Sequence, residues 1–189
     1  MKTKDRSDRK LANCNPCLVA KATLLEAMMN DYFTNDPNRP DLFKKRAYML
    51  IWVDGLRGRK RQEEYFRTGK SKAPYGLSMH NHGLALDLAF FCPQIGQLEY
   101  FDRYEIEGRI IWGMVAKFCE ENHLFWGGKF KSFIDKPHIS LKIGFDSEKE
   151  TCLWLMTLSE LSDMERGKAI EDRRKEFESF ALANYKSIS

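Results

Sequence analysis

The segment Ser78-Met-His-Asn-His-Gly-Leu-Ala-Leu-Asp87 decides how the middle of this 189-residue chain is expected to fold. It runs into Leu84-Ala-Leu-Asp-Leu-Ala-Phe-Phe91, an almost continuous apolar run of the kind that forms a buried strand. His80 and Asp87 are an odd number of residues apart, so one unbroken strand would point them to opposite faces. Gly83 removes that constraint, because glycine permits a tight bend between them.

A second segment, Asp135-Lys-Pro-His138, offers further polar groups far downstream. Pro137 restricts the backbone just before His138. The residues that follow, Ile139-Ser-Leu-Lys-Ile143, alternate like a half-exposed strand. The sequence therefore predicts that two strands each carry a polar group that can bind or react.

Together the two segments contain the side chains that a catalytic metal needs. A catalytic zinc takes three protein ligands and leaves a fourth position open. His80, Asp87 and His138 could supply the three, which would leave Asp135 as the acid/base. The alternative is that these are hydrogen-bonded core or surface groups. A carboxylate in a buried strand is costly unless it is paired or metal-bound, and three of the four histidines fall in these two segments.

These motifs resemble those of the zinc peptidases that act on bacterial cell-wall peptides. That family includes D-Ala-D-Ala carboxypeptidases and dipeptidases and the L-alanyl-D-glutamate endopeptidases of phage endolysins. The resemblance covers about residues 7–145, and its matching positions are Ser78, His80, Gly83, Ala85, Asp87, Trp126-Gly127-Gly128, Asp135, Pro137 and His138. Upstream, Gly55-Leu-Arg57 and Gln62 are similar to the family's Gly-Tyr-Arg-Ser and following Gln.

The resemblance implies a role for each residue of the site. His80, Asp87 and His138 would hold one zinc ion per chain, and Asp135 would transfer protons. His82 would be a neighbour of the zinc ligands, because the family has a variable residue at that position.

The resemblance also implies four residues that bind substrate, and most of them have a structural alternative. Arg57 would hold a carboxylate or carbonyl of the peptide, although it could equally be a solvated charge in the basic run 57–61. Ser78 would touch substrate or cap its turn, and Trp126 would wall the cleft or lie in the core. Gln62 would bind substrate beside Arg57.

The expected fold class is α+β. The resemblance implies a small antiparallel sheet that carries the zinc site on one face and helices on the other, as in Hedgehog and DD-peptidase folds. A strand is predicted over residues 48–53, and helices over about 16–32 and 102–122. Residues 1–146 would form the zinc peptidase domain. Residues 147–189 would be a helical extension packed on it, which Ser147-Glu-Lys-Glu150 opens as a capping box.

Five cysteines are present, and Cys14-Asn-Pro-Cys17 has the spacing of redox and zinc motifs. No second cysteine pair lies nearby in the sequence, so a helix start fits the segment better, with Asn15 as the N-cap and Pro16 in the first turn. We expect all five cysteines to be thiols.

The composition agrees with a soluble globular protein, since 43% of the residues are hydrophobic and 31% are charged. The net charge of +4 favours an anionic partner without identifying one. No apolar run approaches the ~20 residues of a membrane helix, and the first residues lack the apolar core of a signal peptide. We therefore expect a cytoplasmic monomer that binds no membrane and reaches a wall only after release.

The expected activity is zinc-dependent hydrolysis of an amide bond in peptidoglycan stem peptides, by an endolysin-type L-alanyl-D-glutamate endopeptidase. The alternatives are a D-Ala-D-Ala carboxypeptidase or dipeptidase, or an inactive wall-binding protein. A nucleic-acid-binding protein is a rival from another class. Only the basic run 57–61 favours that rival, and no nucleic-acid motif accompanies it.

Overall fold

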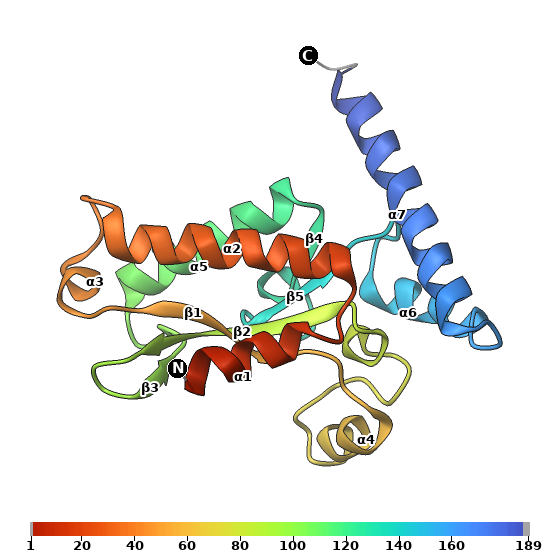
Figure 1. Ribbon diagram of the computed structural model, residues 1–189, viewed down its shortest axis with the longest axis horizontal. Coiled ribbons are helices and arrows are strands. Elements are labelled where there is room, and N and C mark those ends of the chain that lie inside the picture. The colour runs from red at the N-terminus through yellow and green to blue at the C-terminus, as the bar shows by residue number, and fades with distance from the viewer. Residues whose placement is uncertain (1, 187–189) are drawn as a thin grey trace.

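A five-stranded antiparallel sheet lies at the centre of the protein (Figure 1). The structure, a computed structural model, describes residues 2–186. The strands are β1 (Met49–Asp54), β2 (Ala85–Cys92), β3 (Gln97–Glu99), β4 (Leu124–Trp126) and β5 (His138–Leu141). Their order is β1-β2-β5-β4, and β3 pairs with β2. The predicted α+β fold with a small antiparallel sheet is confirmed.

The register of the sheet brings the two sequence motifs together. In the β2–β5 pair, Asp87 lies opposite His138. In the β1–β2 pair, Asp54 lies opposite Asp87, next to a break in the register after Trp52. Three segments that are far apart in the chain therefore meet at one end of the central strand.

Two of the helices, α2 (Pro16–Asn35) and α5 (Glu105–Glu121), cover one face of this sheet. The helices are α1 (Lys2–Leu11), α2 (Pro16–Asn35), α3 (Asp41–Lys45), α4 (Arg59–Arg67), α5 (Glu105–Glu121), α6 (Glu148–Thr157) and α7 (Asp163–Lys186), with short 3-10 turns η1 (Met79–His82) and η2 (Gly127–Lys129). Phe90 of β2 packs against Phe33 of α2 and Trp112 of α5, with ring centroids 5.7 and 5.6 Å away. Because side chains alternate along a strand, Asp87 points to the opposite face.

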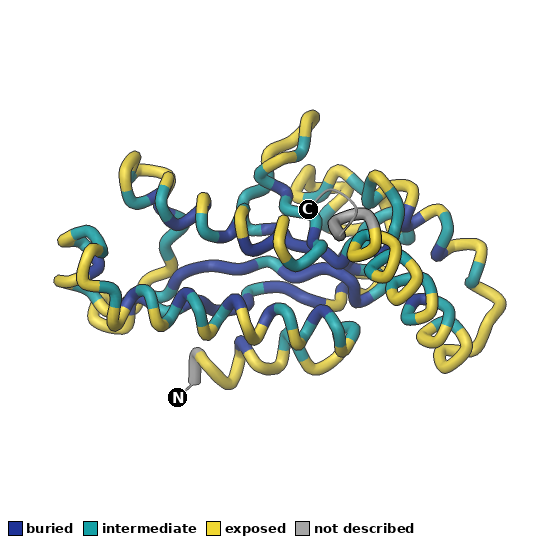
Figure 2. Tube along the Cα trace, turned by 90° about the horizontal axis from the view of Figure 1, so that it is seen from above, coloured by how far each residue is buried: buried dark blue, intermediate teal, exposed yellow. Residues whose placement is uncertain are grey.

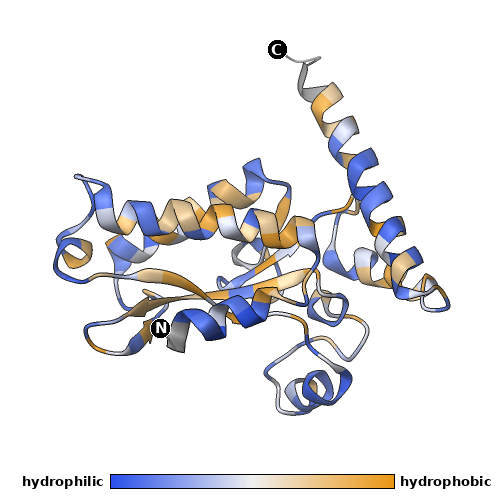
Figure 3. Ribbon diagram, in the orientation of Figure 1, coloured by the Kyte–Doolittle hydropathy of each residue, from blue (hydrophilic) through white to orange (hydrophobic). Residues whose placement is uncertain are grey.

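The hydrophobic core lies between the sheet and these helices. Figure 2 shows the strands as buried segments enclosed by helices whose outer surfaces are exposed. The core includes Leu18, Leu25 and Met29 of α2 and Leu86 and Leu88 of β2, all of which are completely buried. Figure 3 shows the matching hydropathy, with apolar strands and a mostly hydrophilic α1 and α4.

Helix α1 is a charged helix that the sequence did not lead us to expect. It lies along β1, which is an edge strand of the sheet. The Ser7 hydroxyl accepts a hydrogen bond of 2.8 Å from the Trp52 N–H, and the Asn30 side chain of α2 accepts one from the Leu50 N–H. An unpaired strand edge invites association with other chains, and these side chains occupy two of the donors on that edge.

The predicted helix start at residues 14–17 is confirmed. Asn15 caps α2 by accepting a hydrogen bond of 2.9 Å from the Cys17 N–H, and Pro16 is the first helical residue. Cys14 and Cys17 are free thiols. Burial raises the pKa of both thiols. Their environment favours the protonated thiol over the reactive thiolate that a redox motif requires.

The C-terminal residues form two helices, of which α6 packs more closely on the sheet domain. Ser147 caps α6 by accepting a hydrogen bond from the Glu150 N–H, as the capping box predicted. Cys152 and Leu155 of α6 belong to the core. Helix α7 follows α6 and contacts the domain through Ile170, which joins the core, and Glu178, which pairs with Lys21 of α2 (Figure 1). No helix among the described residues has the length and apolar character needed to cross a membrane.

Candidate metal centre and active-site cleft

Three candidate ligands converge from three separate elements. His80 comes from η1, Asp87 from β2 and His138 from β5, and their ligand atoms all lie within 4.8 Å of one another. Asp87 Oδ1 is 3.2 Å from His80 Nε2 and 3.2 Å from His138 Nδ1. The two nitrogen atoms are also 3.2 Å apart.

This triangle has the size that a tetrahedral metal site requires. Ligand atoms at the usual zinc distances, about 2.0–2.2 Å, are separated by about 3.3–3.5 Å in a tetrahedron. Two imidazoles and one carboxylate are also a donor set of known catalytic zinc sites. The three side chains therefore fit a metal ion of this kind.

The local backbone explains how His80 reaches the site. Gly83 ends η1 with φ +66°, a left-handed conformation that favours glycine. A Cβ at Gly83 would also lie 3.0 Å from the Asn13 carbonyl oxygen. His80 Nδ1 lies 2.8 Å from the Gly55 carbonyl oxygen, to which it donates, and this leaves Nε2 as the free donor to a metal. The bend that the sequence predicted at Gly83 is confirmed.

A buried ionic network supports Asp87 from behind. The Arg57 guanidinium donates to Asp54 Oδ2 at 2.7 and 3.1 Å and lies 3.6 Å from Asp87 Oδ2. Arg57 and Asp54 expose only 6% and 7% of their side chains. Arg57 is therefore not a solvated surface charge, and it positions one oxygen of Asp87 while the other faces the histidines.

Gln62 lies beneath this network. It is completely buried. Its side-chain oxygen accepts a hydrogen bond of 2.9 Å from Arg57, and its nitrogen donates to Ser71 and to the Ala73 carbonyl. The structure thus places Gln62 where it orients Arg57 and the 71–73 loop, and it leaves this side chain no exposed surface for a substrate.

The charges of the site act strongly on its titrating groups. Burial by itself raises the pKa of Asp87, but the charges and hydrogen bonds of His80 and His138 hold it well below its usual range. Burial lowers the pKa of His138, and the carboxylates of Glu148 and Asp87 outweigh that effect and raise it. The two shifts describe one coupling, because the carboxylates favour the protonated form of His138 and the histidines favour the ionised form of Asp87.

A cleft of about 390 Å³ opens in front of the three ligands. Of the predicted site residues, Arg57, Ser78, His80, Asp87, Asp135 and His138 line it. Its volume lies within the range of small-molecule and peptide pockets. The carboxyl of Asp135 thus shares the cleft with the metal-binding group, and burial raises its pKa, partly opposed by the charge of His138.

The segment Trp126-Gly127-Gly128 positions the Asp135 loop. The Asp135 N–H donates to the Gly127 carbonyl at 3.0 Å, and a Cβ on Gly127 would lie 2.2 Å from the Asp135 carbonyl oxygen. The Trp126 indole N–H donates to the Lys136 carbonyl at 2.8 Å. Trp126 lines pockets beside the cleft and not the cleft itself. Its position therefore points to support of the loop.

Ser78 and His82 flank the metal-binding group. Ser78 makes no side-chain cap to η1, and it lines the cleft. His82 Nε2 lies 2.9 Å from the Gly76 carbonyl oxygen, and burial lowers its pKa. His82 stands outside the group of converging ligand atoms.

Glu148 belongs to this site, although no sequence motif identified it as a site residue. Its Oε1 atom lies 2.7 Å from His138 Nε2, and it also accepts a hydrogen bond from the Ser140 hydroxyl. The sequence pattern indicates only that Glu148 is an acidic residue at the start of a helix. Its contact with His138 depends on how α6 packs, which local patterns do not encode.

The protein is thus an α+β protein whose antiparallel sheet brings two histidines and a carboxylate that could hold a metal ion into one cleft with a further carboxyl. Comparison with known proteins shows what this part of the chain is similar to. Residues 71–141 match the model of the family described as D-alanyl-D-alanine carboxypeptidase. The predicted resemblance to cell-wall peptidases is confirmed for this segment of the chain.

Two individual proteins are also similar to this chain. It is 30% identical over 102 residues to the peptidoglycan L-alanyl-D-glutamate endopeptidase CwlK of Bacillus subtilis, a match that covers 49% of this chain and 60% of CwlK. The crystal structure of the Serratia marcescens L-Ala D-Glu endopeptidase ChiX matches with a TM-score of 0.50 and 24% identity, over 74% of this chain and 89% of ChiX. The likeness to ChiX supports the fold.

Proposed function

We propose that this protein is a zinc-dependent peptidase that hydrolyses an amide bond in peptidoglycan stem peptides. The observation that carries this function is the convergence of His80, Asp87 and His138 beside Asp135 in one cleft. CwlK and ChiX are both named as L-alanyl-D-glutamate endopeptidases. Their names favour that bond over the terminal D-Ala-D-Ala bond that the family description mentions.

The metal would be held by His80 Nε2, Asp87 Oδ1 and His138 Nδ1. When bound, zinc supplies Lewis-acid polarisation of a carbonyl oxygen and makes a water nucleophile available near neutral pH. The Gly55 carbonyl fixes the ring of His80, and the Arg57 guanidinium fixes the far oxygen of Asp87. These contacts hold the ligand atoms in place before a metal arrives.

Asp135 would act as the general base and then as the general acid. Its carboxylate would accept a proton from the attacking water and pass it to the nitrogen of the leaving amine. Burial raises the pKa of this carboxyl. A raised pKa brings the group closer to the operating pH, which favours both steps. The hydrogen bond from its own N–H to Gly127 keeps the loop in position.

Ser78 and Arg57 are the residues that we assign to substrate contact. Both line the cleft. The Ser78 hydroxyl would bind a polar group of the peptide, and Arg57 would present guanidinium N–H groups to a carbonyl or carboxylate while it supports Asp87. We assign Gln62 and Trp126 to positioning, since one is completely buried and the other holds the Lys136 carbonyl.

We further assign residues 1–146 to the peptidase domain and residues 147–189 to a helical extension packed on it. Support comes from Cys152, Leu155 and Ile170, which join the core, and from the ion pair of 3.0 Å between Lys21 of α2 and Glu178 of α7. A Cβ at Gly144 would lie 3.2 Å from Phe177 of α7, which shows how closely α7 approaches the domain there.

Mass spectrometry of purified muropeptides, digested with the zinc-loaded protein, tests the function. The expected products are stem peptides that begin with D-glutamate, together with L-alanine left on the sugar. Release of D-alanine alone would identify a carboxypeptidase instead. Sedimentation with intact wall and no soluble product would identify a wall-binding protein without activity.

A further inference from the structure

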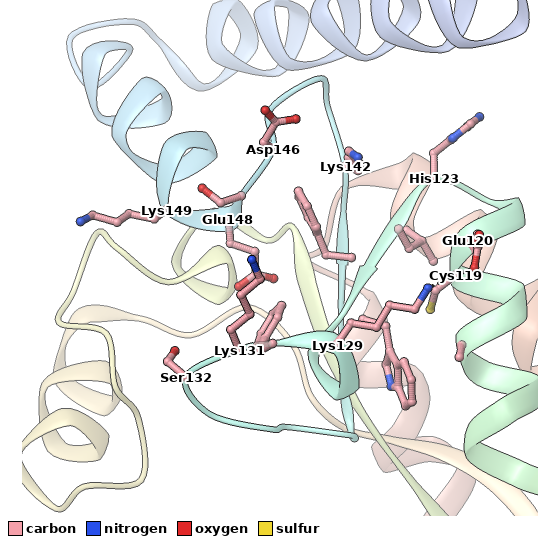
Figure 4. Close-up of a pocket in the computed structure, with 16 residues that line it drawn as sticks. Cys119, Glu120, His123, Lys129, Lys131, Ser132, Lys142, Asp146, Glu148 and Lys149 are labelled. Carbon is pink, nitrogen blue, oxygen red and sulfur yellow. Dashed lines mark hydrogen bonds and ion pairs between the residues drawn. The ribbon is translucent and has the colours of Figure 1, made fainter. Parts of the chain in front are cut away.

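Glu148 stands outside the region that the family model matches, yet its carboxylate reaches the metal-binding group. The match ends at residue 141, and Glu148 is the first residue of α6. Figure 4 shows its side chain directed from the start of α6 into the pocket that adjoins the cleft. Glu148 lines both that pocket and the cleft itself. The C-terminal extension therefore contributes a charged side chain to the site.

The two nitrogen atoms of His138 face different partners. Nδ1 faces Asp87 Oδ1 at 3.2 Å, in the position of a metal ligand. Nε2 lies 2.7 Å from Glu148 Oε1. Because the Glu148 carboxylate can only accept, Nε2 carries a proton, and Nδ1 is the nitrogen that would face a bound metal beside Asp87.

Glu148 is free for this role because other residues cap its helix. The Ser147 hydroxyl accepts from the Glu150 N–H, and the Glu150 carboxylate accepts from the Asp146 N–H. Glu148 exposes only 22% of its side chain, and its oxygen binds His138 and Ser140. A carboxylate in such a place requires partners, and these are the partners it has.

The two histidines of the site are supported differently. His80 Nδ1 donates to a backbone carbonyl, that of Gly55. His138 Nε2 donates to a full negative charge. A carboxylate behind a ligand imidazole fixes its orientation and makes it a stronger donor to the metal. The stronger support thus acts on His138.

We propose that Glu148 is a positioning residue of the metal centre, which orients His138 and raises its donor strength, so that the C-terminal extension completes the site. This role rests on the proposed metal centre. It predicts that the metal affinity of the chain depends on a residue beyond the peptidase motifs.

Zinc affinity, measured by competition with a chelator in the absence of substrate, tests the role. Loss of a supporting partner typically weakens metal affinity about 10–100-fold. We expect Glu148→Gln, which keeps an acceptor and loses the charge, to bind zinc about 10-fold more weakly. Glu148→Ala, which loses both, should approach about 100-fold.

Glu150→Gln is the matched control, because Glu150 lies in the same helix and does not touch His138. It should bind zinc as the native chain does. The ¹⁵N chemical shifts of the His138 ring, recorded on metal-free protein, provide a second readout. They should show a protonated Nε2 in the native chain and a less protonated Nε2 in Glu148→Ala, which has lost the acceptor.

Three results would overturn the role. Native zinc affinity in both Glu148 variants would overturn it while leaving the peptidase function intact. An equal loss of affinity in Glu150→Gln would show that the effect belongs to the helix and not to the contact. A native chain that binds no zinc would overturn the metal centre and this role together. If Glu148→Ala fails to fold, Glu148→Gln, which preserves shape, decides the question.

Discussion

The residues that would bind the metal and the residues that support them come from different parts of the chain. His80, Asp87 and His138 all fall within residues 71–141, the segment that matches the family model. Their supports, Arg57 and Glu148, lie on either side of that segment. Within the segment, spacing and strand register place the ligands. Outside it, packing of a loop and a helix sets their orientation and charge.

This difference predicts a graded response to mutation. Replacing a ligand should remove the metal, whereas replacing a support should leave the site assembled but weaker. The following experiments are arranged from the largest expected effect to the smallest.

The largest effect is expected at the histidine ligands. We expect the native chain to bind one zinc, and His80→Ala and His138→Ala each to lose the metal and the activity together, because two ligands do not make a catalytic zinc site. Elemental analysis of dialysed protein measures the metal. His82→Ala is the control and should keep its zinc, since His82 bonds to Gly76 and not to the site. Loss of zinc from His82→Ala alone would show that the wrong histidine has been chosen.

The second effect separates two carboxylates of the cleft. Asp135→Asn keeps the size of the side chain but cannot accept a proton, so its zinc content should stay native while peptide cleavage falls about 10²–10⁴-fold. Asp87→Asn should lose the metal first, because an amide is a poor zinc ligand. Zinc content and cleavage rate, measured on the same preparations, distinguish the two. The opposite pattern would mean that their roles are exchanged.

The third effect concerns the support behind Asp87. Arg57→Ala removes the main partner of the buried Asp54, which keeps Arg61 at 3.1 Å, so metal-free protein should lose about 1–3 kcal/mol of unfolding free energy. Urea denaturation measures the change. Lys60→Ala, an exposed substitution in the neighbouring helix α4, should change stability by no more than about 0.5 kcal/mol. Equal stability of the two variants would contradict the network described here.

The smallest effect is expected on the alkylation rate of the buried cysteine thiols. Burial raises the pKa of Cys119 and of Cys152 to about 12, so very little thiolate forms at pH 8 and alkylation of these two cysteines in the native protein should be roughly tenfold or more slower than that of free cysteine. Because a raised thiol pKa is lost on unfolding, guanidinium should restore the ordinary rate. Mass spectrometry of alkylated peptides measures each site. A Cys14–Cys17 disulfide in thiol-trapped protein would instead revive the redox interpretation.

Much of the fold was predictable because it depends on local patterns. The apolar run 84–91 gives β2, Asn15 and Pro16 give the start of α2, and Ser147 gives the start of α6. Helix α1 was missed because Leu11 is its one apolar residue, so its sequence shows no apolar stripe of the kind that marks a packed helix. It is held instead by its packing along β1 and by single contacts such as that of Ser7 with Trp52.

The residues of the site also fall into those that the sequence predicted and those that only the structure revealed. The sequence by itself determined the candidate ligands, since His80, Gly83 and Asp87 are close along the chain and Asp135 and His138 share one short loop. Only the tertiary structure decided that Gln62 is buried beneath Arg57, that Trp126 supports the Lys136 carbonyl, and that Glu148 meets His138. The physical reason is range: a bend or a strand follows from neighbouring residues, whereas a contact between distant side chains exists only after the core has packed.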